Sequence, residues 1–165
     1  VARGTGMLLN NEMDDFSAKP GAANAFGLLG GFANAIEPGK RPLSSMTPVI
    51  VLKEGQPWLA TGTPGGARII TTVLQTILNT IDFKMNIAEA LSMPRVHHQW
   101  MPDFLRIEKG LSPDTIRLLK EKGHVVRVMP TMGRVQTVQQ QNGVLFGATD
   151  PRNPDGAAIG IERMQ

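Results

Sequence analysis

The placement of glycine and proline constrains the fold of this 165-residue chain more than any other feature. Both residues recur through residues 1–48, at Pro20-Gly21, Gly30-Gly31 and Pro38-Gly39, too often for a long helix. From Pro48 onward they fall between periodic segments instead. The sequence therefore predicts an irregular N-terminal stretch, followed by a region of regular strands and helices.

Alternating and continuous apolar runs predict the strands. The predicted strands are 49–53, 58–63, 125–129, 135–140 and 144–148, with Met7-Leu8-Leu9 as a short buried strand in the N-terminal stretch. The first two form a hairpin that we expect in the middle of a sheet. Asn142-Gly143 is typical of a two-residue hairpin turn and joins the last two.

Three helices are predicted from apolar spacing and capping signals. The first covers 71–81, with a buried stripe of Val73, Leu74, Ile77, Leu78 and Ile81. The second begins at Asn86, which forms a capping box with Glu89, and ends before Pro94. The third begins at Ser112-Pro113-Asp114, where Ser112 caps the helix, and stops at Gly123. Strands and helices in this order indicate an α+β or layered α/β domain.

Composition excludes several classes of protein. The net charge is +3, but acids and bases interleave, only 5% of residues are aromatic and there is no tyrosine, so we expect no nucleic-acid partner. No apolar run reaches the roughly 18 residues of a membrane span. The absence of cysteine excludes disulfides, thiolate zinc sites and cysteine nucleophiles, and leaves the redox compartment open.

Carboxylates and amides cluster in Asn10-Asn11-Glu12-Met13-Asp14-Asp15-Phe16. They could converge on an ammonium group or a cation. On local chemistry alone, a solvated turn with Asx-type self-capping is the simpler interpretation. The alternating oxygen ligands of a calcium loop are absent, so we predict no metal site.

Two further segments could bind anions. Ser44 and Ser45 lie between Pro42 and Pro48, where a rigid extended backbone could present both hydroxyls to a carboxylate or phosphate. Thr61-Gly62-Thr63-Pro64-Gly65-Gly66-Ala67-Arg68 joins a predicted strand to a helix. There, backbone N–H groups could stabilise an anionic oxygen, although a plain tight turn remains an alternative. No P-loop or dinucleotide-binding glycine pattern occurs.

His97 and His98 are adjacent in Pro94-Arg95-Val96-His97-His98-Gln99-Trp100. A helical zinc pair requires a four-residue interval, so neighbouring histidines rarely share a site. We predict a structural role for this segment, with hydrogen-bonded histidines and a packed Trp100.

Together these motifs resemble the small subunit of γ-glutamyltranspeptidase. The resemblance is carried, in order, by Asn10-Asn11-Glu12-Met13-Asp14-Asp15-Phe16-Ser17, Pro42-Leu43-Ser44-Ser45-Met46, Gly62-Thr63-Pro64-Gly65-Gly66-Ala67-Arg68-Ile69-Ile70 and Pro94-Arg95-Val96-His97-His98-Gln99-Trp100. It continues through Leu111-Ser112-Pro113-Asp114 to Gly147-Ala148-Thr149-Asp150-Pro151-Arg152. The resemblance implies that residues 1–165 are the C-terminal part of the small-subunit domain.

The resemblance also implies a fold, a reaction and partners. The fold is part of a four-layer αββα sandwich of the N-terminal-nucleophile hydrolases, with the sheet completed by missing small-subunit strands and by the large subunit. A self-cleaving precursor yields both subunits as a heterodimer. The enzyme moves the γ-glutamyl group of glutathione, glutamine and similar amides to water, amino acids or peptides, without a cofactor. Bacterial members are periplasmic or secreted.

Site residues follow by motif from the same resemblance. Glu12 and Asp15 would hold the α-ammonium of the γ-glutamyl group, and Ser44 and Ser45 its α-carboxylate. The N–H groups of Gly65 and Gly66 would form the oxyanion hole. Asp15 argues against the related cephalosporin acylases, whose substrate need not carry that amine.

Two departures from the family pattern stand out. Residues 20–31 resemble a lid loop in which Phe26 replaces a common tyrosine, so closure would depend on packing rather than a hydroxyl. The nucleophilic threonine of the family begins a stretch of roughly thirty residues before the Gly6-Met7-Leu8-Leu9 segment, whereas Thr5 is internal and cannot use a free α-amine. We therefore expect the nucleophile outside this chain and no activity from the chain alone. The alternative is a non-catalytic amino-acid-binding module or an inactive fragment of the same family.

Overall fold

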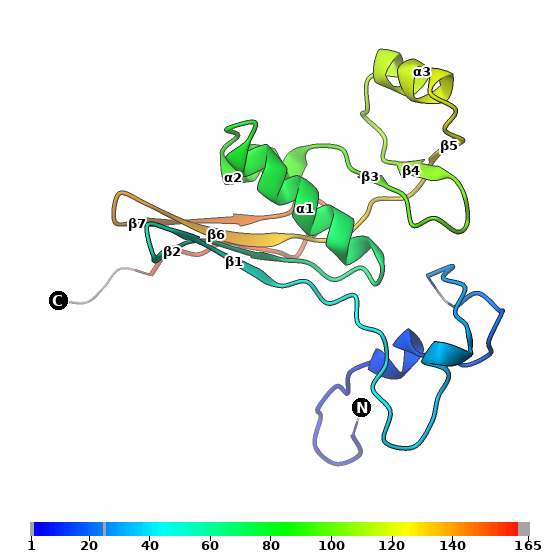
Figure 1. Ribbon diagram of the computed structural model, residues 1–165. Helices are drawn as coiled ribbons and strands as arrows, with labels where there is room; N and C mark the ends of the chain where they lie inside the picture. The colour runs from blue at the N-terminus through cyan, green and yellow to red at the C-terminus, as the bar shows by residue number, and fades with distance from the viewer. Residues whose placement is uncertain (1, 25, 162–165) are drawn as a thin grey trace. The chain divides into compact units, whose positions relative to one another are not determined.

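The computed structural model describes residues 2–24 and 26–161 of the chain. Two compact units make up the chain, Val1–Ser45 and Met46–Gln165. The first is irregular, as the glycine and proline pattern predicts, and the second holds the sheets and the α-helices (Figure 1). Each unit is described in turn.

The first unit contains two short 3₁₀ helices, η1 (Glu12–Asp15) and η2 (Phe32–Asn34). Isolated bridges join Ser17 to Ala35 and Ala23 to Leu29. The predicted strand at Met7-Leu8-Leu9 is wrong: these residues are 64%, 83% and 69% exposed and form no strand within the described residues of this unit. A strand needs a partner for its backbone, and the sequence pattern alone did not show whether the unit offers one.

The second unit is built on an antiparallel four-stranded sheet of order β1-β2-β6-β7. Its strands are β1 (Val49–Lys53), β2 (Gln56–Gly62), β6 (Gln136–Gln141) and β7 (Val144–Thr149). Both predicted hairpins are confirmed, and Asn142 and Gly143 take the positive φ angles of 51° and 78° that the second turn requires. The first hairpin is not in the middle of the sheet, because β1 is an edge strand and only β2 is interior.

A separate three-stranded sheet has the order β3-β4-β5. It consists of β3 (Val96–His97), β4 (Leu105–Ile107) and β5 (Val126–Val128), with β4 and β5 parallel. The prediction included β5 but missed β3 and β4. Runs of two and three residues are too short for alternation to be recognised.

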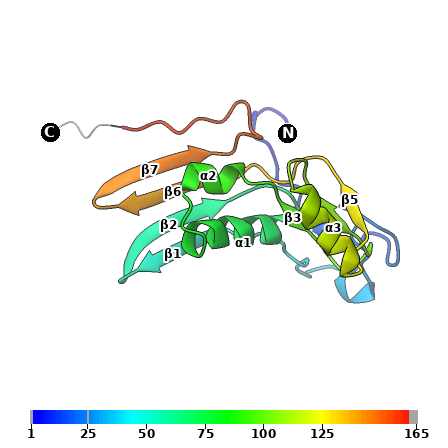
Figure 2. The ribbon, with the colours of Figure 1, turned by 90° about the horizontal axis from the view of Figure 1, so that it is seen from above.

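Helices α1 (Arg68–Ile81) and α2 (Ile87–Ser92) cover one face of the four-stranded sheet. The third helix, α3 (Pro113–Glu121), contacts β5. Seen from above, α1 lies along β2 and α2 lies over β6 and β7 (Figure 2). The core between the helices and the sheet is formed by Leu59, Ile87, Leu91, Val135 and Ala148, with Val51, Trp58 and Ile77 packed against it.

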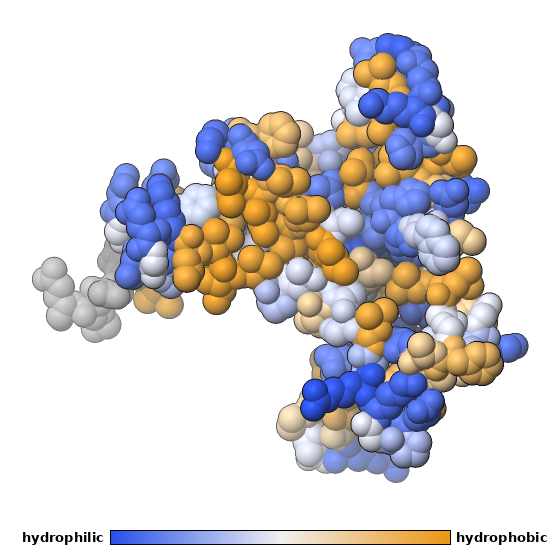
Figure 3. Space-filling view, in the orientation of Figure 1, coloured by the Kyte–Doolittle hydropathy of each residue, from blue (hydrophilic) through white to orange (hydrophobic). Residues whose placement is uncertain are grey.

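The buried stripe of α1 matches the prediction only in part: Val73 is buried and Ile77 packs against the core, as predicted. Its buried residues are Ile69, Thr72, Val73, Thr76 and Thr80. The threonines can be buried because Thr76 and Thr80 each donate a hydroxyl hydrogen bond to the carbonyl four residues earlier, at 3.0 and 2.9 Å. Leu74 and Leu78 instead face outward, 51% and 37% exposed, and apolar side chains gather over this part of the surface (Figure 3).

The other two helices, α2 and α3, differ in how their N-termini are capped. The predicted capping box of Asn86 and Glu89 is confirmed, with Glu89 N donating to Asn86 Oδ1 at 2.9 Å and Asn86 N to Glu89 Oε2 at 3.2 Å. Ser112 is the N-cap residue of α3, as predicted, but its hydroxyl makes no capping hydrogen bond. Ser112 supplies only the extended backbone that precedes the helix.

Asn86→Ala should lower the free energy of unfolding by about 1 kcal/mol, because it removes the side-chain acceptor of the Glu89 N–H at the start of α2. Ser112→Ala is the matched control and should change it by less than about 0.5 kcal/mol. Urea unfolding followed by circular dichroism measures both. Equal effects of the two substitutions would contradict the capping assignment.

Candidate functional site

Gly65 and Gly66 form the turn between β2 and α1. Their φ angles are 148° and 58°, and the turn leads directly into the 14-residue helix α1. Neither N–H group donates a hydrogen bond to another residue in the described part of the chain. The turn therefore presents two unused donors beside the positive end of a helix, a setting suited to an anionic oxygen.

Hydrogen bonds hold the carbonyl groups of the same two peptides. The Thr63 hydroxyl donates to Pro64 O at 2.8 Å, and Pro64 O shares a peptide group with the Gly65 N–H. Gly65 O accepts from Arg68 N at 3.3 Å and from Arg68 Nε at 3.4 Å, and shares a peptide group with the Gly66 N–H. Both peptide planes are thereby fixed from the carbonyl side.

Residues 132–135 pack against this turn. Arg134 N donates to Thr63 Oγ1 at 2.7 Å. Gly133 has a φ of +72°, and a Cβ at this position would lie 2.7 Å from Thr63 Oγ1 and 3.0 Å from Thr72 Cγ2. Only glycine fits without displacing these side chains, so the segment and the turn are closely coupled.

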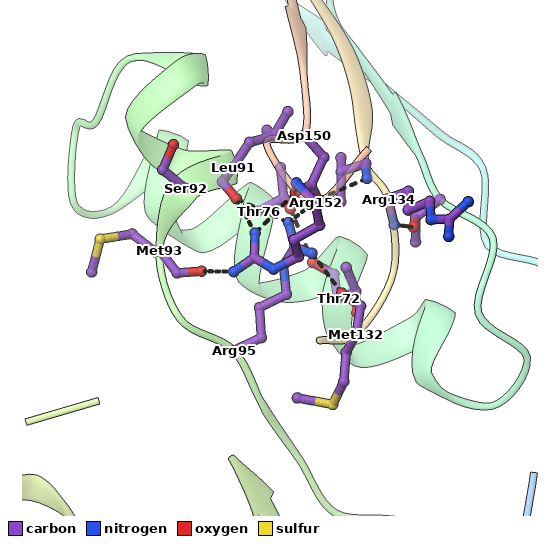
Figure 4. A network of polar contacts seen from close by, with 12 residues as sticks. Thr72, Thr76, Leu91, Ser92, Met93, Arg95, Met132, Arg134, Asp150 and Arg152 are labelled. Atoms are coloured by element: carbon purple, nitrogen blue, oxygen red, sulfur yellow. Dashed lines mark hydrogen bonds and ion pairs between the residues drawn. The ribbon is translucent and has the colours of Figure 1, made fainter. Parts of the chain in front are cut away.

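A buried cluster of four charged side chains, Arg95, Glu108, Asp150 and Arg152, fixes residues 132–135. Figure 4 shows Arg95, Asp150 and Arg152. Arg95 contacts Asp150 at 2.6 Å, and Arg152 contacts both Asp150 and Glu108. The residues Arg95, Glu108 and Asp150 are 3%, 3% and 0% exposed. Their backbone partners are Met132 O on Arg95, Met132 N on Glu108, Val135 N on Asp150, and Leu91 O on both arginines. The cluster thus ties the segment to α2 and β7.

Burial and pairing act in opposite directions on these charges. Burial alone would raise the pKa of Asp150, but hydrogen bonds from the N–H groups of Arg152 and Val135 and from both guanidinium groups hold it below its ordinary value. Burial likewise opposes the charge of Arg152, yet its bonds to Glu108 and Asp150 raise its pKa. Burial lowers the pKa of Arg95 despite the bond to Asp150. The carboxylate of Asp150 is therefore kept ionised.

The first unit contains the carboxylates predicted to bind the α-ammonium. Asp15, at the end of η1, lines a cavity of about 220 Å³ whose wall includes Asn24, Leu28 and Gly30 from the lid-like residues 20–31. Glu12 is exposed and does not line it. The buried Ser17 hydroxyl at this cavity makes no hydrogen bond within the described residues. Of the two predicted acids, only Asp15 lines this partly open cavity, and the neighbouring Asp14 lines it as well.

Two asparagines, which the sequence interpretation did not single out, organise this unit. Asn24 Oδ1 accepts from Phe26 N and Leu28 N at 3.0 and 2.9 Å, which shapes the lid-like segment. Asn34 Nδ2 donates to Asp15 O at 2.7 Å, and Asn34 Oδ1 accepts from Leu43 N at 2.9 Å. Asn34 thus joins the end of η1 to the residue preceding Ser44 and Ser45. The sequence signal for this role was the presence of asparagine in a glycine-rich stretch, since asparagine side chains readily bond to the backbone of turns.

His97 is a structural residue, as predicted. Its ring is 3% exposed, with Nδ1 2.8 Å from Thr71 Oγ1 and Nε2 2.9 Å from Gln99 Oε1. Burial lowers its pKa and favours the neutral ring. The expectation of a packed Trp100 is wrong, since this side chain is 78% exposed. Trp100 lies between β3 and β4 and has a positive φ of 67°.

Two further properties concern the described residues, 2–24 and 26–161. Within them no three histidine or acidic side chains are grouped so that they could hold a metal ion. None of their helices is long and apolar enough to cross a membrane.

The α+β arrangement, with helices on one face of an antiparallel sheet, is that of the N-terminal-nucleophile hydrolases. A crystal structure of a mutant of Helicobacter pylori gamma-glutamyltranspeptidase matches 93% of this chain with a TM-score of 0.85 and 56% identity. The enzyme from Pseudomonas nitroreducens, complexed with L-DON, matches 98% with a TM-score of 0.87 and 43% identity. The expected fold class is thereby confirmed.

Sequence comparison identifies the family. The family model described as gamma-glutamyltranspeptidase matches residues 1–160, and the chain belongs to this family. The glutathione hydrolase proenzyme of Escherichia coli strain K12 is 58% identical over 161 residues, 97% of this chain. The chain spans 28% of the length of that relative, and 85% of the matched Helicobacter pylori chain.

Asp150→Asn should lower the free energy of unfolding by about 3–5 kcal/mol, because it leaves Arg95 without its buried ion-pair partner and Arg152 with Glu108 alone. Because the pKa of Asp150 is lowered on folding, its contribution is present above about pH 4 and is lost as the pH falls below that value toward the lower pKa of the folded state. Denaturant unfolding between pH 3 and 7 measures both effects.

Asp114→Asn is the matched control, since Asp114 pairs with Arg117 at 4.0 Å and is 87% exposed. It should change stability by less than about 1 kcal/mol. An Asp150→Asn protein with wild-type stability and wild-type acid sensitivity would rule out a stabilising role for the cluster.

Proposed function

We propose that this chain supplies the substrate-binding and oxyanion-stabilising part of a γ-glutamyltransferase that also hydrolyses glutathione. The single observation that carries the proposal is the Gly65-Gly66 turn, with two unused N–H donors at a helix N-terminus, in a chain of the gamma-glutamyltranspeptidase family. Acyl transfer requires such donors at the carbonyl oxygen under attack. Glutathione, glutamine and related γ-glutamyl amides are the proposed donors, and water, amino acids or peptides the acceptors.

The nucleophile is proposed to be a threonine supplied from outside this chain. Thr5 is unsuitable, because its α-nitrogen lies within a peptide bond and its hydroxyl donates to Ala2 O at 3.0 Å. An N-terminal threonine adds its hydroxyl oxygen to the γ-carbonyl and passes the proton to its own α-amine. The C–N bond then breaks, the proton leaves with the departing amine, and water or an acceptor amine releases the γ-glutamyl group.

Binding of the γ-glutamyl head group is proposed to use charge complementarity. Asp15, with Glu12, would pair with the α-ammonium, and Ser44 and Ser45 would donate hydrogen bonds to the α-carboxylate. The cavity beside Asp15 and the hydrogen bond from Asn34 to Asp15 O support this role, since Asp15 lines the cavity and its backbone is held in place. Residues 20–31 would cover the bound group, with closure by packing of Phe26.

A companion polypeptide is proposed to cover the apolar surfaces of the second unit. Ile70, Leu74 and Leu78 form an exposed row on α1, and Ile50, Leu145 and Phe146 are exposed on the four-stranded sheet. Rows of exposed apolar side chains favour a further packed layer. We propose that this layer comes from the large subunit and the rest of the small subunit of a self-cleaving precursor. We expect the assembled enzyme to be periplasmic or secreted.

The complete precursor should release p-nitroaniline from γ-glutamyl-p-nitroanilide, and addition of glycylglycine should increase the rate by opening the transfer route. The 165-residue chain alone should release none, because it lacks an N-terminal threonine nucleophile. Absorbance at the p-nitroaniline band measures both. Turnover by the isolated chain would contradict the assignment of the nucleophile, and an inactive precursor that binds glutamate would favour a binding module.

Asp15→Asn in the complete enzyme should raise KM for γ-glutamyl-p-nitroanilide by about 10- to 100-fold, since one charge-assisted contact to the ammonium is worth about 1.5–3 kcal/mol. Asp114→Asn is the matched control, because Asp114 is 87% exposed on α3 and is not among the residues that line the cavity beside Asp15. This substitution should leave KM within about twofold. Equal KM values for the two variants would remove Asp15 from the site.

A further inference from the structure

We infer that the Thr63 hydroxyl is a positioning group for the oxyanion hole, acting through the peptide bond between Pro64 and Gly65. The inference rests on the proposed function, because it concerns the same turn. It adds a residue that touches neither the substrate nor the reacting atoms. The observation behind it is the pair of hydrogen bonds made by Thr63 Oγ1, one to Pro64 O at 2.8 Å and one from Arg134 N at 2.7 Å.

The first step of the argument is the geometry of one peptide group. The carbonyl oxygen of Pro64 and the N–H of Gly65 belong to the same planar trans peptide unit and point in opposite directions. A hydroxyl that holds Pro64 O therefore also fixes the direction of the Gly65 N–H. This control is needed here because Gly65, with no side chain and a φ of 148°, does little to restrict its own peptide plane.

The second step is the strength of the donor. Arg134 N donates to Thr63 Oγ1, and the Thr63 hydroxyl in turn donates to Pro64 O. Hydrogen bonds in series polarise one another. When the carbonyl oxygen of a peptide group accepts a hydrogen bond, the N–H of the same peptide group becomes a stronger donor. The chain from Arg134 through Thr63 thus both orients and strengthens the Gly65 N–H.

The third step is the close approach of Gly133, which holds the hydroxyl in place. A methyl group at Gly133 would lie 2.7 Å from Thr63 Oγ1, well inside contact distance. Thr63 is therefore confined on one side by the backbone of residues 132–135. That backbone is in turn anchored by the buried cluster through Met132 and Val135.

The consequence concerns the transition state rather than substrate binding. Negative charge develops on the γ-carbonyl oxygen when the nucleophile adds, and again when the acyl group is transferred. A misdirected Gly65 N–H would lose its bond to that charge, whereas the contacts to the α-ammonium and α-carboxylate would persist. Loss of the Thr63 hydroxyl should therefore lower kcat and leave KM nearly unchanged.

The test compares Thr63→Val with Thr63→Ser in the complete precursor, assayed with γ-glutamyl-p-nitroanilide. Thr63→Val keeps the side-chain shape without the hydroxyl and should lower kcat by about 10- to 100-fold, less than the 10²- to 10³-fold loss on removing an oxyanion donor outright. Thr63→Ser keeps the hydroxyl and should stay within about threefold of wild type. KM should change by less than about threefold in both.

Gly133→Ala supplies a second variant, because it displaces the hydroxyl without removing it and remains informative if Thr63→Val fails to fold. It should also lower kcat, and combined with Thr63→Val it should add little. Gly55→Ala is the matched control: its φ is +76°, but nothing lies within 4 Å of an added Cβ. If a variant precursor does not cleave itself, its large and small subunits are expressed as two separate chains and assembled. The measured kcat then does not depend on whether the precursor was cleaved.

The outcomes separate the inference from the function it rests on. A wild-type enzyme without γ-glutamyl transfer would refute the proposed function. An active wild type with unchanged kcat in Thr63→Val would overturn the role of Thr63 alone. Equal losses of kcat in Thr63→Val and Thr63→Ser, or equal losses in Gly133→Ala and Gly55→Ala, would likewise overturn it.

Discussion

The buried cluster of Arg95, Glu108, Asp150 and Arg152 is the interaction on which the second unit depends. Its members come from the segment after α2, the end of β4 and the end of β7, which no short-range contact would bring together. Charges this deeply buried are tolerated only when each is paired and hydrogen-bonded. The cluster meets that condition through backbone groups of Leu91, Met132 and Val135 as well as through its own ion pairs. It therefore specifies one arrangement of these segments.

That arrangement extends to the Gly65-Gly66 turn. The cluster fixes Met132 and Val135, and the two residues between them, Gly133 and Arg134, press against Thr63 and bond to it. Thr63 and Arg68 then hold the carbonyl groups of the two peptides whose N–H groups remain unused. A structural ion cluster thus connects to a proposed catalytic group through a short series of contacts. Preorganisation of this kind is what makes backbone donors effective in acyl transfer.

The first unit is stabilised in a different way. It contains no regular strand in its described residues, and its shape depends on asparagine side chains that replace backbone partners. Asn24 shapes the lid-like segment, and Asn34 links η1 to the residue before Ser44. Side-chain bonds of this type stabilise a loop locally without a large core. Such a scaffold suits the proposed γ-glutamyl site, which must admit and release a small substrate.

The sequence by itself determined the local structure: the capping box of Asn86, the turn at Asn142-Gly143, the irregular first 48 residues and the glycine pair at the start of α1. These features depend on neighbouring residues, and their signals lie within a few positions of one another. Only the tertiary structure decided which side of α1 is buried, that Trp100 is exposed, that Met7-Leu8-Leu9 forms no strand, and that Thr63 meets Arg134. Each of these depends on what lies opposite a residue in space. A pattern of apolar spacing cannot specify that, because burial and pairing are set by segments far apart in the chain.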